Sequence, residues 1–163
     1  MNAKQTRYQA MVRHFRELRV YQQAFKAAMR IYELSKGWPP EKRYSLTNQI
    51  RRASRSVCVN ISEAWRKRRY ERHFVSKLSD ADTEAAETQG WLDFALACHY
   101  ISRKDYEELD QEYESISGGL VKMMTQPKQW CGPSNLIREE KAEYRATPSF
   151  LPHPHTPILP NNE

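Results

Sequence analysis

The sequence predicts an all-α fold. Apolar residues recur at intervals of three and four along most of the chain, which is the period of one face of an α-helix. Glycine is scarce, with five in 163 residues, whereas a turn-rich sheet protein needs more of it. With 39% hydrophobic and 28% charged residues, the chain has room for one core of ordinary size plus a tail.

The first helix is expected from about residue 13 to about residue 36, after a polar, flexible lead-in at residues 1–12. Its end is set by Gly37, which accepts a left-handed cap, and by Pro39 and Pro40, which cannot continue the hydrogen-bond ladder. The residues on its apolar face are Phe15, Leu18, Phe25, Ala28 and Tyr32, widened by Val20, Tyr21, Ala24 and Ile31.

The second helix is expected to begin between Glu41 and Leu46, with Ser45 as a possible cap, and to end near Arg69. A basic end of this kind interacts favourably with the negative end of the helix dipole. The apolar stripe has the spacing that a helix in a bundle needs, and consists of Leu46, Ile50, Ala53, Val57, Ile61 and Ala64.

A third helix is predicted by an apolar stripe of Phe74, Leu78, Ala81, Ala85, Thr88, Leu92, Ala95 and His99. Trp91, Phe94 and Cys98 form a second apolar flank on it, which is typical of a helix that is central or that borders another subunit.

The fourth helix is predicted to start at Ser102, whose hydroxyl can cap it with Asp105 at the third helical position. Its stripe runs through Tyr106, Leu109, Tyr113, Ile116, Leu120 and Met123. Gly118 and Gly119 indicate either a close helix contact or a local kink. With short connections, the four helices are expected to form an antiparallel up-down-up-down bundle over residues 13–126.

The rest of the chain, residues 127–163, reads as a tail. Seven of the nine prolines lie at or after position 127, and no sustained apolar period follows, so this part is expected to be extended or disordered when free. Residues 138–145 could form a short exposed helix. Residues 150–155 could dock on a partner as a polyproline-like strip, although an untethered terminus is the simpler interpretation.

Positive charge is concentrated at the end of the second helix. Residues 51–72 contain eight Lys or Arg against two Glu, a local excess of +6 that equals the formal net charge of the whole chain. Arginine dominates, and the flanking Trp65 and Tyr70 can stack on bases. The candidate nucleic-acid-binding residues are Arg51, Arg52, Arg55, Trp65, Arg66, Lys67, Arg68, Arg69, Tyr70 and Arg72.

Other kinds of site are weakly supported. No Glu has a His three residues later, so the di-iron pattern of helical bundles is absent, and no cofactor or metal site is expected. Asp80, Glu84 and Glu87 lie on one helix face and are interpreted as structural partners of Arg51, Arg52 or Arg55 rather than as catalytic acids. Three Cys with no close pair fit reduced thiols. Without an apolar leader or an apolar run of membrane length, a cytoplasmic protein with no membrane partner is expected.

The chain resembles a family of small four-helix-bundle proteins. This family comprises the rRNA intervening-sequence proteins and the accessory variability determinants of diversity-generating retroelements. The residues that carry the resemblance include Phe15, Leu18, Val20-Tyr21, Ala24, Ile31-Tyr32, Trp38-Pro39, Glu41, Tyr44, Leu46, Gln49-Ile50-Arg51-Arg52-Ala53, Ser56, Asn60-Ile61, Glu63, Phe74, Leu78, Ala81 and Glu87-Thr88. Ala64 stands where the family usually has Gly, and Thr83-Glu84 where a Gly-Ser pair often occurs.

The resemblance implies a ring-shaped homo-oligomer, expected to be a pentamer, with a basic surface. In the retroelement branch it implies a reverse transcriptase and its RNA template as partners. The residues and the resemblance together predict a non-catalytic adaptor that binds structured RNA or an RNA/DNA hybrid. Two alternatives stay open: a protein-protein interaction scaffold, and an rRNA intervening-sequence-encoded bundle protein without a dedicated nucleic-acid ligand.

Overall fold

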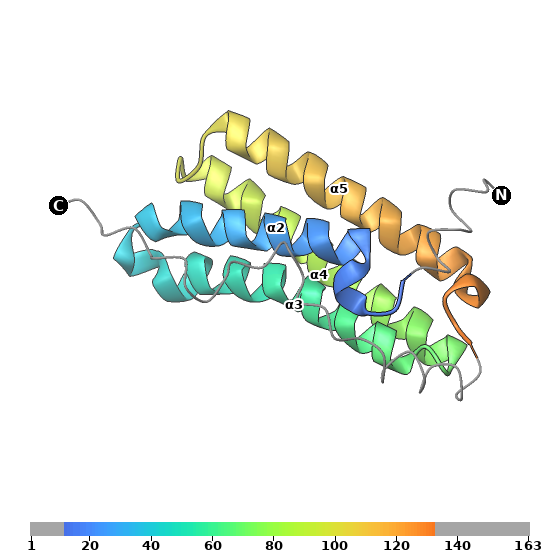
Figure 1. The fold of residues 1–163 in the computed structure, drawn as a ribbon. Coiled ribbons are helices and arrows are strands. Elements are labelled where there is room, and N and C mark those ends of the chain that lie inside the picture. The colour runs from blue at the N-terminus through green and yellow to red at the C-terminus, as the bar shows by residue number, and fades with distance from the viewer. Residues whose placement is uncertain (1–11, 133–163) are drawn as a thin grey trace, which may run out of the picture.

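The computed structural model describes residues 12–132, and this part of the chain is all-α, as predicted. Its long helices are α2 (Arg19–Leu34), α3 (Asn48–Lys67), α4 (Glu71–Ala97) and α5 (Arg103–Thr125). Figure 1 shows these helices side by side, with no strand in the described range. The start of α2 and the end of α5 lie at the same end of the molecule (Figure 1).

The core lies where the apolar stripes of the four helices meet. The predicted stripe of the second helix is confirmed, because all of its six positions from Leu46 to Ala64 are at most 6% exposed. The stripes of α4 and α5 are equally buried from Phe74 to Ala95 and from Leu109 to Met123. Since α4 packs against both α3 and α5, and α2 also packs against α3 and α5, the four helices enclose one apolar interior.

The first helix is shorter than predicted. Residues Phe15–Glu17 form a 3-10 turn capped by the side chain of His14, and Leu18 then has an extended backbone, so that α2 begins at Arg19. Leu18 itself is 1% exposed. The extended backbone at Leu18 interrupts the helix that the spacing had predicted to be continuous, while its side chain remains in the core.

The apolar face of the first helix also differs from the prediction. Its buried residues are Val20, Ala24, Ala27, Ala28 and Ile31. Phe25 is only partly buried and Tyr32 is 40% exposed, although both were assigned to the core-facing stripe.

The second helix is entered through two distorted turns. A 3-10 turn covers Pro40–Lys42 and a π-helical turn covers Arg43–Thr47, and regular α-helix begins at Asn48. Ser45 lies inside the π-helical turn and does not cap the helix. The predicted end near Arg69 differs from the observed end at Lys67 by two residues.

The connection between α4 and α5 is a tight turn. His99 has a φ of 60°, and the amide of Tyr100 donates to the carbonyl of Ala95 at 2.9 Å, which closes the end of α4. His99 is therefore outside the helix that its spacing had placed it in. The predicted cap of α5 is confirmed, because the hydroxyl of Ser102 accepts a hydrogen bond from the amide of Asp105 at 3.0 Å.

Helix α5 continues through both of its glycines. A Cβ on Gly119 would lie 3.4 Å from Cγ2 of Val20, whereas one on Gly118 would meet nothing within 4 Å. The close helix contact is thus the correct alternative, and it is between α5 and α2.

The first residues assigned to the tail are packed on the bundle. Pro127–Gln129 form a 3-10 turn, and Trp130 and Cys131 lie partly buried against the core. The lead-in at residues 1–11, the helix expected at 138–145 and the strip at 150–155 lie outside the described residues.

Candidate nucleic-acid interface

Four cationic side chains are exposed where α3 ends and α4 begins. Arg66 and Lys67 occupy the last turn of α3, Arg69 lies in the connection, and Arg72 lies in the first turn of α4. Within residues 12–132 none of the four has an ion pair or a hydrogen bond from its side chain. We call Arg66, Lys67, Arg69 and Arg72 the exit cluster.

The local structure explains why these side chains face outward. The apolar stripe of α3 ends at Ala64 and Trp65, and the connection of Arg68–Tyr70 is too short to fold back over its neighbours. Tyr70, in the middle of the cluster, is 60% exposed, and its ring lies 5.6 Å from the ring of His73. The cluster thus combines exposed charges with an exposed aromatic ring.

Arg68 and Trp65 do not belong to this exposed surface. Arg68 is 2% exposed and Trp65 is 5% exposed. The guanidinium of Arg68 lies 4.0 Å over the ring of Trp65, and its Nη1 donates to the carbonyl oxygen of Trp65 at 2.7 Å. Both residues were predicted to contact nucleic acid. Both are instead buried and contact each other.

The three arginines at the start of α3 have partners within the protein. Arg51 donates from Nε to the Ser35 hydroxyl at 2.7 Å and lies 4.8 Å over the ring of Tyr32. Arg55 donates from Nε to the carbonyl of Arg51 at 2.8 Å. These contacts hold both side chains along the α2–α3 surface, away from the exit cluster.

The predicted acidic set divides between two basic side chains. Arg52 forms ion pairs with Glu87 at 2.8 Å and with Glu84 at 3.8 Å, which joins α3 to α4 as expected. Asp80 instead pairs with Lys77 of its own helix at 3.0 Å. Lys77 also pairs with Glu63 of α3 at 2.9 Å, a bridge between the two helices that the charge pattern did not predict.

Burial and a neighbouring carboxylate act on Glu84. Desolvation and the charge of Glu87 raise the pKa of Glu84 above its usual value, and the nearby Arg52 only partly opposes them. Its Oε2 is buried and has no hydrogen-bond partner in the described part of the chain. The charge of Arg52 is therefore used within the bundle, where it faces two neighbouring carboxylates.

The N-terminal turn adds positive charge to the same end of the molecule. The pKa of His14 is lowered by burial and by the charges of Arg16, Arg66 and Arg68, which places this turn near the end of α3. Nδ1 of His14 also accepts from the amide of Arg16 at 3.3 Å. Helical spacing could not reveal this neighbour, because it depends on how α2 packs against α3.

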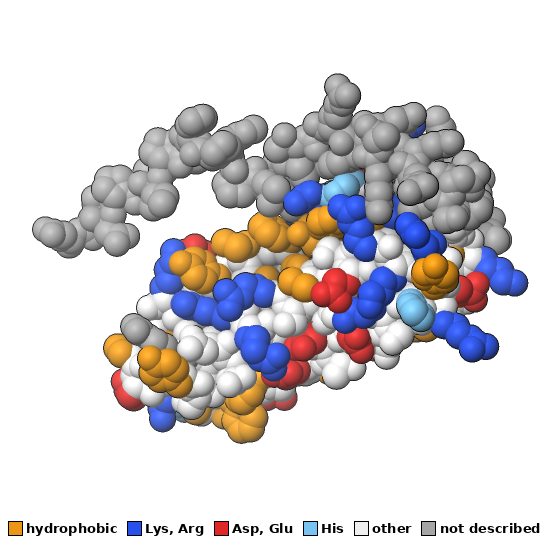
Figure 2. All heavy atoms as spheres, turned by 90° about the horizontal axis from the view of Figure 1, so that it is seen from below, with side chains coloured by type: hydrophobic (Ala, Val, Ile, Leu, Met, Phe, Trp, Pro, Cys, Tyr) orange, Lys and Arg blue, Asp and Glu red, His pale blue; other side chains and the backbone are white. Residues whose placement is uncertain are grey.

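Figure 2 shows Lys and Arg side chains on one face of the molecule, with an apolar strip between some of them.

Among residues 12–132, no group of three or more His, Cys, Asp or Glu side chains is placed to hold a metal ion. In that same range no helix combines the length and the apolar character needed to cross a membrane.

The fold and this basic end define a small four-helix protein with an exposed cationic surface. The chain belongs to the family of 23S rRNA-intervening sequence proteins, whose pattern matches residues 16–122. It is also similar to a solved structure from Bacteroides thetaiotaomicron, a protein of unknown function from the S23 ribosomal protein family. The two are 30% identical, the match covers 66% of this chain and 96% of that chain, and the TM-score is 0.60. A search of curated proteins finds no match.

Proposed function

We propose that this protein is a non-catalytic adaptor that binds structured RNA, or an RNA/DNA hybrid, through the exit cluster. The observation that carries the proposal is the contrast between two sets of arginines. Arg52 is ion-paired with Glu84 and Glu87, Arg51 is hydrogen-bonded to Ser35, and Arg55 uses only its Nε on its own helix, whereas Arg66, Arg69 and Arg72 have no partner among residues 12–132. Free guanidinium groups on a rigid helix end suit phosphate contacts, because no internal ion pair has to be broken first.

The proposed mode of recognition is contact with the sugar-phosphate backbone. The exit cluster is short, and Tyr70 offers one exposed ring for stacking on an unpaired base. Such a surface supports affinity for the shape of a folded RNA rather than reading of base edges. Binding of this kind depends strongly on salt, since counterions are released from the nucleic acid.

We further propose that the helices follow the antiparallel up-down-up-down order and that the protein assembles into a homo-oligomeric ring, with a pentamer as the expected number. The second apolar flank of α4 supports self-association, because Phe94 is 61% exposed and its ring centroid lies 5.8 Å from that of Trp91. A ring would repeat the exit cluster on one surface, and repetition increases the affinity of a weak site.

A reverse transcriptase is the proposed protein partner, on the resemblance to retroelement accessory proteins alone. Co-purification of the tagged protein with a reverse transcriptase encoded nearby would test it directly.

The test of RNA binding is affinity for a structured RNA over a salt series. Changing Arg66, Lys67, Arg69 and Arg72 together to Ala should weaken binding and reduce the slope of log K against log salt by about 3. A matched control changes Lys26, Lys42, Lys104 and Lys122 to Ala, which removes the same number of exposed charges from other helices and connections. The control variant should keep most of the slope of log K against log salt that the unmodified protein shows.

Equal losses in the two variants would contradict the proposal, because net charge rather than the exit cluster would then govern binding. An unchanged slope in the exit-cluster variant would also contradict it, because these four residues would then not contact the RNA.

The alternative function is a protein-interaction scaffold. It is favoured by one observation, the exposed apolar residues Met29, Tyr32 and Val59 on the α2–α3 surface. A ratio of absorbance at 260 and 280 nm that falls after nuclease treatment of the purified protein would support the RNA adaptor, and a low ratio from the outset would support the scaffold.

A further inference from the structure

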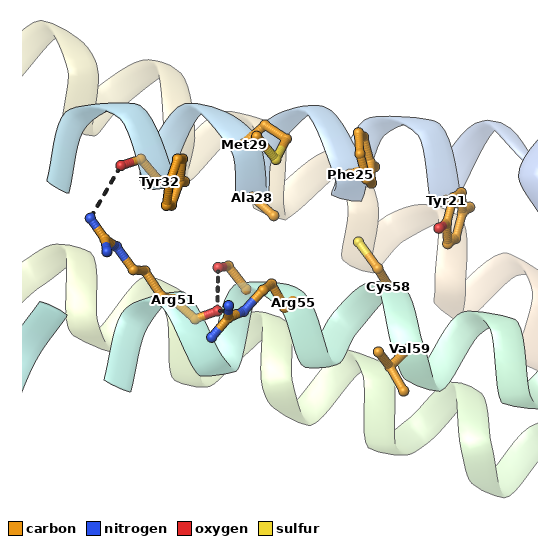
Figure 3. A pocket seen from close by; sticks show the side chains of 10 residues that line it. Tyr21, Phe25, Ala28, Met29, Tyr32, Arg51, Arg55, Cys58 and Val59 are labelled. Carbon is orange, nitrogen blue, oxygen red and sulfur yellow. Dashed lines mark hydrogen bonds between the residues drawn. The ribbon is translucent and has the colours of Figure 1, made fainter. Parts of the chain in front are cut away.

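An apolar groove runs between α2 and α3. Its volume is about 430 Å³, and its walls include Tyr21, Phe25, Met29 and Tyr32 from α2 and Cys58 and Val59 from α3 (Figure 3). Three of these side chains are unusually exposed for apolar residues, at 43% for Met29, 40% for Tyr32 and 53% for Val59. An accessible strip of this kind is typical of a binding surface.

We propose that this groove binds the chain's own Pro-rich segment at residues 150–154, which lies outside the described residues. The segment contains Phe150, Leu151, Pro152 and Pro154, and no Lys, Arg, Asp or Glu occurs from residue 146 to residue 162. It therefore lies in the part of the tail that leaves water for an apolar groove at low cost, and it contains the one Phe of residues 146–162.

The side chains of the groove suit a proline-rich strand. Polyproline II segments dock in grooves lined by aromatic rings, and here the rings are those of Tyr21, Phe25 and Tyr32. Such a segment leaves its backbone carbonyls without internal hydrogen bonds. Arg55, held in the groove through its Nε, has its terminal nitrogens without a partner in the described range and can donate to those carbonyls (Figure 3).

The dimensions of segment and groove agree. From Tyr21 to Tyr32 the groove is about 16 Å long at the rise of an α-helix. Five residues of polyproline II span about 15 Å. The segment thus fills the groove along its length, with Phe150 and Leu151 placed to enter beside Cys58.

The tail starts close enough to reach this position. Cys131 lies near Arg68 and Glu71, whose charges act on its pKa, so the tail leaves the bundle at the α3–α4 connection. From there to Arg55 is about 20 Å along α3. The 18 residue steps from Gly132 to Phe150 span up to about 60 Å when extended, which is ample.

The first experiment measures chymotrypsin cleavage after Phe150 in the full chain, followed by mass spectrometry. Met29→Glu with Val59→Glu should speed this cleavage about tenfold by releasing the segment. The matched control, Tyr44→Glu with Val121→Glu, places the same charges on exposed apolar positions outside the groove and should cleave as the unmodified chain does. Equal cleavage rates in all three chains would overturn the proposal.

Light scattering on the same proteins shows whether a second copy of the protein, rather than the tail, occupies the groove. If the groove variants have a lower molar mass in solution than the unmodified chain while cleavage after Phe150 is unchanged, the groove binds another protomer and the proposal is wrong. A constant mass with faster cleavage supports the tail.

A second measurement does not depend on how well the charged variants fold. Val59→Cys combined with Leu151→Cys should form an intramolecular disulfide under mild oxidation, whereas Val121→Cys with Leu151→Cys should not. Cross-linking only between molecules, or equal yields in the two pairs, would exclude the proposed docking.

Discussion

The guanidinium of Arg68 lies 4.0 Å over the indole ring of Trp65 and donates to the carbonyl oxygen of the same residue. It is the one member of the run from Arg66 to Arg69 that turns into the bundle, since it is 2% exposed while its three neighbours in the run are exposed. One continuous basic motif therefore contains side chains with two different roles.

Arg68→Ala should lower the free energy of unfolding by about 2 kcal/mol, because a buried hydrogen bond from a charged group and a desolvated cation–π contact are both lost. Arg69→Ala, one residue along, should change it by less than about 0.5 kcal/mol. Urea unfolding measures both values. If the two variants lose equal stability, Arg68 does not support the end of α3.

The pH dependence of the free energy of unfolding should show the raised pKa of Glu84. Because its pKa is raised in the folded state, the stabilisation from protonated Glu84 is complete below its ordinary pKa of 4.5 and is lost as the pH rises through the folded value. Glu84→Gln should therefore be more stable than the unmodified protein at pH 7, by up to about 1 kcal/mol, and equal to it near pH 3.

Thermal unfolding of the Glu84→Gln variant across pH 3 to 8 provides that comparison, with the exposed Glu41→Gln as a control for the loss of one surface carboxylate. A constant difference at all pH values would mean that packing, rather than ionisation, separates Glu84 from Gln.

The two adjacent glycines of α5 should respond in opposite ways. Gly118→Ala should stabilise the protein by about 0.5–1 kcal/mol, because its new Cβ meets no atom within 4 Å and Ala favours a helix. Gly119→Leu should destabilise it by about 1–3 kcal/mol, because the larger side chain must displace Val20. Unfolding by denaturant of the two variants tests the α2–α5 contact, which would be refuted by a neutral Gly119→Leu.

The three thiols should differ in reactivity. Burial raises the pKa of Cys58 to about 12 and that of Cys131 to about 11, so at pH 8 very little of either is thiolate, whereas Cys98 is exposed. A thiol reagent applied to the native protein should show one fast phase, and Cys98→Ser should abolish it. A fast phase that persists in this variant would mean that the α2–α3 groove or the α5 end opens readily.

Much of the fold could be predicted from local patterns. The stripe from Leu46 to Ala64, the cap at Ser102 and the stop after Thr125 depend on spacing, a side-chain hydroxyl and a following proline, all of which act within a few residues. The break at Leu18 was not predicted, because this residue continues the apolar spacing of α2 and is buried although its backbone is extended.

The candidate site was predicted less completely. The run of charges predicted where the basic surface lies, but not which residues form it. His14 and Arg16 lie at the same end of the molecule although they are some fifty residues away in the chain, and Arg68 is buried. Phe25 and Tyr32 were assigned to the core and instead line a groove.

Taken alone, the amino-acid sequence determined the all-α class, the apolar stripes and the position of the positive charge, because periodicity and charge are properties of neighbouring residues. Only the tertiary structure decided which arginines are free and which are used internally. That choice depends on the carboxylates, carbonyls and rings that other helices bring within a few ångströms, as Glu87 is brought to Arg52 and Tyr32 to Arg51.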